Sequence, residues 1–160
     1  SLNSIDELRL RYVDGEVRQY DVIHPTYTVM TKASVFENCK NQMEDSYLKF
    51  YENCHQTIET TKNQTKVNDG YNDNQNYDVY YITCLPWISY TAMTHPIPEN
   101  MKESCSVPRI CFGKYTKTND EKYVLSFNLT VSHALVDGYP CSKALNQLKE
   151  NCMHAKDFLK

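Results

Sequence analysis

The sequence lacks the features of membrane, secreted and nucleic-acid-binding proteins. No apolar stretch approaches the ~20 residues that cross a bilayer, and no basic start precedes an apolar signal core. The 17 Lys and Arg are scattered and outnumbered by 20 Asp and Glu, which gives a formal net charge of -3. Nucleic-acid binders concentrate positive charge, because phosphate neutralisation dominates their affinity. We therefore expect a cytoplasmic protein whose partners are neither nucleic acid nor a membrane.

The seven cysteines include no CxxC pair and no regular framework. An odd count of this kind fits reduced thiols in the cytosol better than a disulfide scaffold. Cys54-His55 and Cys152-Met153-His154 bring soft ligands close together but without the paired spacing of a zinc site, so no metal is expected. Cys141 is the cysteine nearest to His133, but it falls in a first helical turn and no Cys-His-Asn order accompanies it. Covalent cysteine catalysis is therefore disfavoured.

Extended segments dominate the chain. Asp14-Gly15 suits a tight hairpin turn between strands at 8–12 and 17–22, and His24-Pro25 should end the second of these strands. β-branched and aromatic residues predict further strands at 27–31, 79–84, 87–93, 110–116 and 123–131. Polar or proline-containing loops are expected at 61–78 and 94–106.

Two segments have the period of a helix. Apolar residues recur at three- and four-residue steps from about 35 to 58, as on one face of an amphipathic helix. A closing helix is expected at 140–154, where Pro140 suits a first turn. We predict one α/β domain over residues 1–160, a two-layer sandwich whose mainly antiparallel mixed sheet is covered by helices.

The segment from Leu129 to Pro140 carries the most chemical information. An apolar strand runs into His133, and Asp137-Gly138 follows one helical turn later, just before the closing helix. An imidazole titrates near neutral pH, which makes it a natural general base. Asp137 is expected to brace the turn rather than contact substrate, and Gly138 permits a sharp change of backbone direction. Taken alone, a histidine at a strand end is more often just a hydrogen-bonded polar residue.

The string His133-x-x-x-Asp137-Gly138 after an apolar strand resembles the motif of the CoA-dependent acyltransferases, which include chloramphenicol acetyltransferases and dihydrolipoyl acyltransferases. Further segments are similar to the chloramphenicol acetyltransferases in that family's order and at near-family spacing. They lie at 13–17, 21–29, 86–91, 113–115 and 145–148. The resemblance covers about residues 4–152 and implies the CoA-dependent acyltransferase fold.

The resemblance also implies a mechanism. His133 would take a proton from the acceptor hydroxyl as its oxygen attacks the thioester of acetyl-CoA, and Ser89 would donate a hydrogen bond to the oxyanion. Without the resemblance, Ser89 would be taken for an exposed strand serine. No acyl-enzyme forms in the family, acetyl-CoA is a co-substrate rather than a bound cofactor, and the site lies between subunits of a homotrimer. The implied role is antibiotic resistance; the residues that contact CoA are not identified.

Several departures from the family pattern concern the acceptor and the start of the chain. Arg109, Cys111 and Leu85 replace an aliphatic residue, a threonine and an asparagine, and a guanidinium facing an apolar nitrophenyl group is costly unless it is paired. Ser132 replaces the first of two adjacent histidines. The family's opening quarter, including an arginine that pairs with the motif aspartate, has no counterpart, so residues 1–160 alone are expected to be poorly soluble or inactive. The alternatives are a dihydrolipoyl acyltransferase-like core and a non-catalytic remnant of the fold.

Overall fold

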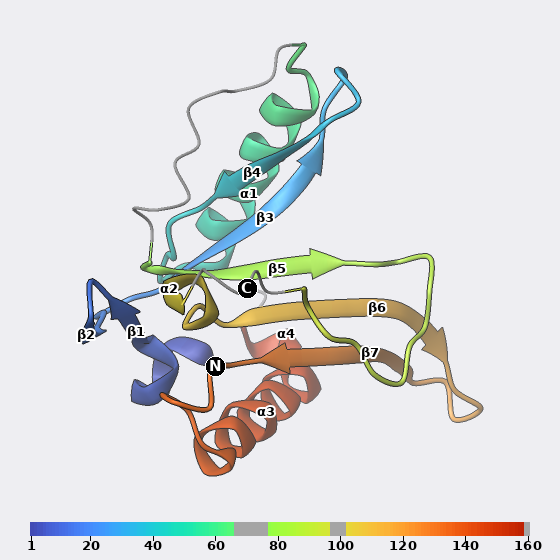
Figure 1. Cartoon of the computed structure of the whole chain (residues 1–160). Coiled ribbons are helices and arrows are strands. Elements are labelled where there is room, and N and C mark those ends of the chain that lie inside the picture. Colours follow the sequence, from blue (N-terminus) through green and yellow to red (C-terminus); the bar gives the residue numbers. More distant parts are fainter. Residues whose placement is uncertain (66–76, 97–101, 159–160) are drawn as a thin grey trace.

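The computed structural model describes residues 1–65, 77–96 and 102–158 as a mixed sheet covered by helices (Figure 1). Two short 3-10 helices open the chain, η1 and η2, before a two-stranded hairpin, β1 and β2. Five strands form the main sheet in the order β4-β3-β5-β6-β7. In chain order the elements are η1 Leu2–Ser4, η2 Asp6–Arg9, β1 Leu10–Val13, β2 Glu16–Gln19, β3 His24–Met30, β4 Phe36–Lys40, α1 Tyr47–Lys62, β5 Val79–Cys84, α2 Lys102–Cys105, β6 Arg109–Lys117, β7 Tyr123–Thr130, α3 Gly138–Met153 and α4 Ala155–Phe158.

The sheet combines parallel and antiparallel pairings. The β3/β5 and β5/β6 pairs are parallel, whereas β3/β4, β6/β7 and the β1/β2 hairpin are antiparallel. The predicted class, a mainly antiparallel mixed sheet with helices, is therefore confirmed.

Both long helices lie on one face of the main sheet. The register aligns Cys39, Tyr27, Ile82, Ile110 and Leu129 across the five strands, so their side chains share that face. The thiol of Cys39 lies 3.2 Å from the hydroxyl of Thr61 in α1. Ile82, Ile110 and Leu129 line a cavity together with residues of α3.

The opposite face of the sheet carries the chain that leaves β5. Tyr81, Arg109 and Thr130 form one cross-strand row on this face, and Thr83, Cys111 and Asn128 form the next. In Figure 1 this chain turns back over β6 and β7. Its contacts with Cys111 and Asn128 place residues 87–93 on the face away from α1 and α3.

The hairpin prediction is confirmed with shorter strands. Asp14 and Gly15 have φ values of 53° and 84°, and both therefore adopt the left-handed conformation that a two-residue hairpin turn requires. Pro25 does not end a strand; it is the second residue of β3, and its carbonyl accepts a hydrogen bond from the Asn41 amide. Proline is tolerated there because a strand's first residues need not donate to the ladder.

The prediction of one helix over residues 35–58 is wrong in its first part. Residues 36–40 form β4, in which buried Glu37 and Cys39 alternate with more exposed neighbours, as in a strand. The helix α1 begins after Ser46, whose hydroxyl accepts from the Lys49 amide as an N-cap. Phe36 and Cys39 fit the period of a helix but lie on opposite faces of the strand, and pairing with β3 decides in favour of the strand.

The strand predicted at 87–93 is also absent from the structure: the residues there follow an irregular path. Strands at 79–84, 110–116 and 123–131 are confirmed by β5, β6 and β7, and the closing helix is confirmed as α3. Most of the loop predicted at 61–78, and residues 97–101 of the second loop, lie outside the described residues. The short helix α2 was not predicted. No helix in the described parts is both long and apolar enough to cross a bilayer.

Candidate active site

His133 lies in a tight turn between β7 and α3. The carbonyl of Ser132 accepts hydrogen bonds from the amides of Leu135 and Val136, each at 3.0 Å, and these bonds close the turn. Val136 is buried in a cluster with Ile5, Leu8 and Ala144, to which the 3-10 helices and α3 contribute. The buried side chain of Val136 thus anchors the turn to this cluster. The His133 side chain, in contrast, is 89% exposed.

Asp137 contacts the candidate base directly. One of its carboxylate oxygens, Oδ1, lies 3.2 Å from Nδ1 of His133, and the aspartate side chain is 78% exposed. Asp137 is the N-cap residue of α3, yet its side chain makes no capping hydrogen bond. The contact with His133 spans the turn, and the expected bracing role of Asp137 stays a prediction. A proton held on Nδ1 beside this carboxylate leaves Nε2 as the basic nitrogen, which is what a general base needs.

Ser89 is exposed and lies in the irregular segment that follows Pro86. The peptides on either side of it are fastened to the sheet: the Lys114 amide donates to the Ile88 carbonyl at 2.7 Å, and the Ser126 hydroxyl donates to the Tyr90 carbonyl at 2.6 Å. Ser89 lines a cavity of about 360 Å³ whose other walls come from β6, β7 and its own neighbours. His133 is not among the residues that line this cavity.

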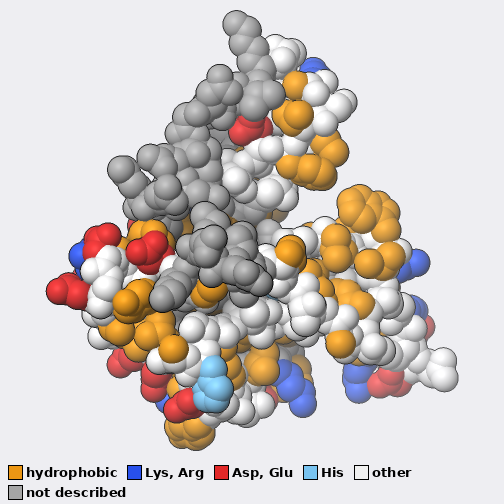
Figure 2. All heavy atoms as spheres, viewed as in Figure 1, with side chains coloured by type: hydrophobic (Ala, Val, Ile, Leu, Met, Phe, Trp, Pro, Cys, Tyr) orange, Lys and Arg blue, Asp and Glu red, His pale blue; other side chains and the backbone are white. Residues whose placement is uncertain are grey.

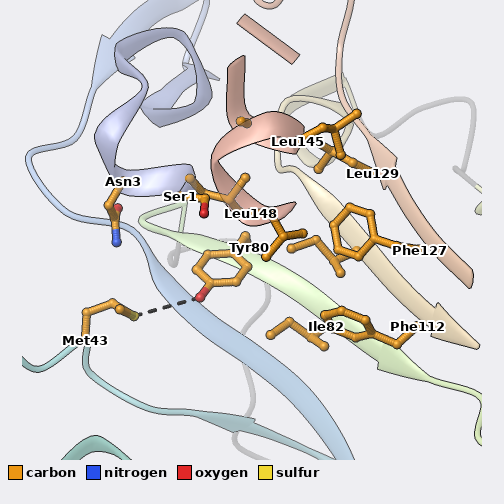
Figure 3. Close-up of a pocket in the computed structure, with 13 residues that line it drawn as sticks. Ser1, Asn3, Met43, Tyr80, Ile82, Phe112, Phe127, Leu129, Leu145 and Leu148 are labelled. Atoms are coloured by element: carbon orange, nitrogen blue, oxygen red, sulfur yellow. Dashed lines mark hydrogen bonds between the residues drawn. The ribbon is translucent and has the colours of Figure 1, made fainter. Parts of the chain in front are cut away.

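A second cavity, of about 240 Å³, lies between the sheet and α3 (Figure 3). Its walls are mostly aliphatic and aromatic side chains of β5, β6, β7 and α3, and the hydroxyl of Tyr80 points to the sulfur of Met43 at 3.8 Å. Neither His133 nor Ser89 lines it. It lies on the helix-covered face of the sheet and holds none of the candidate catalytic groups.

Arg109 lies on the other face, and its cross-strand partner Thr130 is three residues before His133. Its guanidinium donates to the Ser104 hydroxyl at 2.8 Å and to the Val107 carbonyl at 3.3 Å, and lies 5.6 Å from the ring centre of Tyr81. Within the described residues no carboxylate forms a salt bridge with it. A hydroxyl, a carbonyl and an aromatic face therefore compensate the burial of this charge.

Cys111 and Leu85, the other two residues that depart from the family pattern, have structural roles. Cys111 is fully buried in β6, and its thiol lies 3.8 Å from the Phe112 carbonyl. The Leu85 amide donates to the Phe112 carbonyl at 2.8 Å and so extends the β5/β6 ladder by one residue.

Burial, with a smaller contribution from the nearby guanidinium of Arg109, lowers the pKa of His95.

Two polar clusters were not anticipated from the sequence. Nδ1 of His24 accepts from the Met43 amide at 3.0 Å, and Asp78 lies between His24 and Lys40, at 3.8 Å and 2.7 Å respectively. Arg11 is fully buried and, among the described residues, donates to backbone carbonyls alone. The charge of Arg11 among the apolar residues of a strand could have predicted this cluster, because a buried arginine requires several hydrogen-bond acceptors. Within the described residues, no group of three or more His, Cys, Asp or Glu could hold a metal ion.

Comparison with known proteins gives a consistent result. A family model described as chloramphenicol acetyltransferase matches residues 1–149. A chloramphenicol acetyltransferase of Bacillus pumilus is 25% identical over 160 residues, covering 99% of this chain and 70% of the relative. One from Escherichia coli is 26% identical over 153 residues, covering 94% of this chain and 67% of the relative.

Solved structures share the fold. A chloramphenicol acetyltransferase structure superposes with a TM-score of 0.79 at 20% identity, covering 99% of this chain and 72% of that one. The dihydrolipoamide acetyltransferase of Azotobacter vinelandii gives a TM-score of 0.67 at 16% identity, covering 99% of this chain and 66% of its own. The predicted CoA-dependent acyltransferase fold is thereby confirmed.

Proposed function

The chain belongs to the chloramphenicol acetyltransferase family, and from that premise we propose that His133 is the general base for acetyl transfer from acetyl-CoA to a hydroxyl of chloramphenicol or a similar small acceptor. Family membership makes the chain an acyltransferase with acetyl-CoA as co-substrate. The observation that carries the assignment of His133 is its contact with Asp137 on a turn anchored by buried Val136.

The reaction is a direct transfer. Nε2 of His133 takes the proton of the acceptor hydroxyl as its oxygen attacks the thioester carbonyl carbon. The hydroxyl of Ser89 donates a hydrogen bond to the oxyanion that develops on the carbonyl oxygen. The tetrahedral intermediate collapses with cleavage of the carbon–sulfur bond, and the proton passes from Nε2 to the leaving thiolate. The products are the acetylated acceptor and free CoA, and no cofactor stays bound between turnovers.

A second copy of the chain is needed to complete the site. An exposed imidazole and an exposed serine offer no dry environment for an oxyanion, and electrostatic stabilisation is strong only where water is excluded. Exposed apolar residues gather near the C-terminal end of β6 and the N-terminal end of β7 (Figure 2). β7 is an outer strand of the sheet. These residues are Trp87, Ile88, Tyr115, Tyr123, Val124 and Leu125. Such a surface, beside a sheet edge, suits association between copies, and we assign it to a homotrimer.

The acceptor is chloramphenicol or another small hydroxyl compound, and the protein acts in antibiotic resistance in the cytoplasm, where acetyl-CoA is available. The relatives named chloramphenicol acetyltransferase support this acceptor. Arg109 is compatible with it, because the guanidinium is engaged by Ser104, Val107 and Tyr81 rather than left unpaired. No feature of the described chain favours a dihydrolipoyl acceptor over this one.

The test is acetyl transfer followed by release of the CoA thiol. Purified protein is incubated with acetyl-CoA and chloramphenicol, and a thiol-reactive chromophore records free CoA while chromatography identifies the acetylated product. Thiol release that depends on chloramphenicol supports the proposal. Release only with dihydrolipoamide would favour the dihydrolipoyl alternative, and no release with either acceptor would fit a non-catalytic remnant or the inactivity expected of residues 1–160 alone. Sedimentation of the same sample tests the trimer.

A further inference from the structure

The segment that carries Ser89 is not part of the sheet. Residues 87–93, here called the Ser89 segment, follow an irregular path, so no strand ladder defines their position. An oxyanion donor, however, must be held within about 0.5 Å of its productive place. Something other than secondary structure has to supply that precision.

A small set of hydrogen bonds fastens the Ser89 segment to β6 and β7. On one side of Ser89 the Ile88 carbonyl is held by the Lys114 amide, and on the other side the Tyr90 carbonyl is held by the Ser126 hydroxyl at 2.6 Å. The side-chain hydroxyl of Tyr90 donates to the Cys111 carbonyl, also at 2.6 Å. Two neighbouring peptides and one ring are thus fixed, and Ser89 lies between them.

Gly113 permits this close approach. A Cβ atom at position 113 would lie 3.0 Å from Cε1 of Tyr90, 3.1 Å from the Ile88 carbonyl oxygen and 3.1 Å from Cβ of Ser126. All three contacts are tighter than ordinary van der Waals distance, and all three involve the groups that hold the Ser89 segment. The ring of Tyr90 therefore packs against a surface on which no side chain fits.

The phenol of Tyr90 is a dependable donor. Burial, together with its interaction with Cys111, raises the pKa of Tyr90 to about 12. The hydroxyl therefore keeps the proton that its hydrogen bond to the Cys111 carbonyl uses throughout the range in which an imidazole base works.

We propose that Tyr90, supported by Ser126 and Gly113, is a positioning residue that aims the Ser89 hydroxyl at the oxyanion. The inference rests on the proposed function, because it gives Tyr90 a role only through Ser89. Tyr90 itself touches no reacting atom. Its hydroxyl fixes the ring to β6, and the ring fixes the peptide that follows Ser89. The loss of that bond lets the Ser89 segment shift, and a small displacement of a catalytic group is enough to slow the reaction.

The test is a double-mutant cycle of Tyr90→Phe and Ser89→Ala, with kcat, KM and melting temperature measured for each variant. Tyr90→Phe keeps the ring and removes one hydroxyl, so we expect kcat to fall about 10-fold while KM for acetyl-CoA stays within about twofold. In the Ser89→Ala background the same change should have no further effect on kcat, because there is no longer a donor to aim. Ser126→Ala should behave like Tyr90→Phe, and Tyr51→Phe, an exposed tyrosine of α1, is the matched control that leaves kcat unchanged.

The outcomes separate this inference from the function on which it rests. A lowered kcat in Ser89→Ala beside a wild-type kcat in Tyr90→Phe would overturn the positioning role alone. An equal loss from Tyr90→Phe in both backgrounds would also overturn it, because the effect would then not pass through Ser89. A wild-type kcat in Ser89→Ala would remove the oxyanion assignment itself, and the role of Tyr90 with it.

Discussion

Replacing Arg11 with methionine should destabilise the fold strongly. The guanidinium is fully buried and donates hydrogen bonds of 2.6 to 3.0 Å to the carbonyls of Leu8, Leu10, Tyr77 and Val79. These bonds tie η2 and β1 to the chain entering β5. Burial lowers the pKa of Arg11 to about 10, so the side chain is still charged at neutral pH.

The magnitude follows from these four bonds. Hydrogen bonds to a charged group contribute about 1.5–3 kcal/mol each, so four give a gross contribution of roughly 6–12 kcal/mol. Keeping the charge out of water costs several kcal/mol, and methionine removes that cost. We expect a net loss of about 3–5 kcal/mol, which is large beside a typical stability of about 5–15 kcal/mol.

Urea denaturation followed by circular dichroism measures this loss. Arg18→Met is the matched control, because Arg18 is the cross-strand partner of Arg11 in the hairpin but is exposed and forms a surface ion pair with Asp14. That variant should lose less than about 1 kcal/mol. A loss below about 1 kcal/mol in Arg11→Met would refute the reasoning, since the buried carbonyls would then have found other donors.

Three further predictions concern the site and its surroundings. Ser89→Ala should lower kcat by roughly 10²-fold, the scale of one lost oxyanion donor; a rise in KM for the acceptor alone would make Ser89 a binding residue. Asp137→Asn should lower kcat with little change in melting temperature, because the carboxylate contacts His133 and makes no capping hydrogen bond; a large fall in melting temperature with normal kcat would support the bracing role instead. Burial lowers the pKa of His24, which lies beside Asp78 and Lys40. The unfolded chain therefore binds a proton that the folded chain does not, and stability should fall as the pH drops below about 6.5. Melting temperatures at pH 7.5 and 5.5 should converge in His24→Gln, and an unchanged difference would contradict this.

The parts of the fold that local chemistry determines could be predicted from the sequence. Asp14-Gly15 tolerates positive φ, and the hairpin is there. The order β7, turn, α3 was indicated by an apolar strand that runs into His133 and by Gly138 and Pro140, which suit the start of a helix. The structure has this order. In each case the residues that decide the conformation are neighbours in the chain.

The parts that depend on distant residues could not be predicted. A strand is favoured by the propensities of Trp87, Ile88 and Tyr90. In the structure, hydrogen bonds from Ser126 and other residues of the sheet take the place of a strand ladder there. The acceptors of Arg11 lie up to 68 residues away in the sequence. The contact between His133 and Asp137 was within reach, since residues four apart share one face of a turn. The bracing role that the sequence favours for the aspartate stays a prediction.

The most direct test of the account is the turnover of His133→Ala with acetyl-CoA and chloramphenicol. A general base acts mainly in the transition state, so kcat should fall by about 10²–10⁴-fold while KM for acetyl-CoA stays near the wild-type value. The His133 side chain is exposed, and its removal should leave the melting temperature unchanged. A near-wild-type kcat in a folded His133→Ala protein would contradict the mechanism.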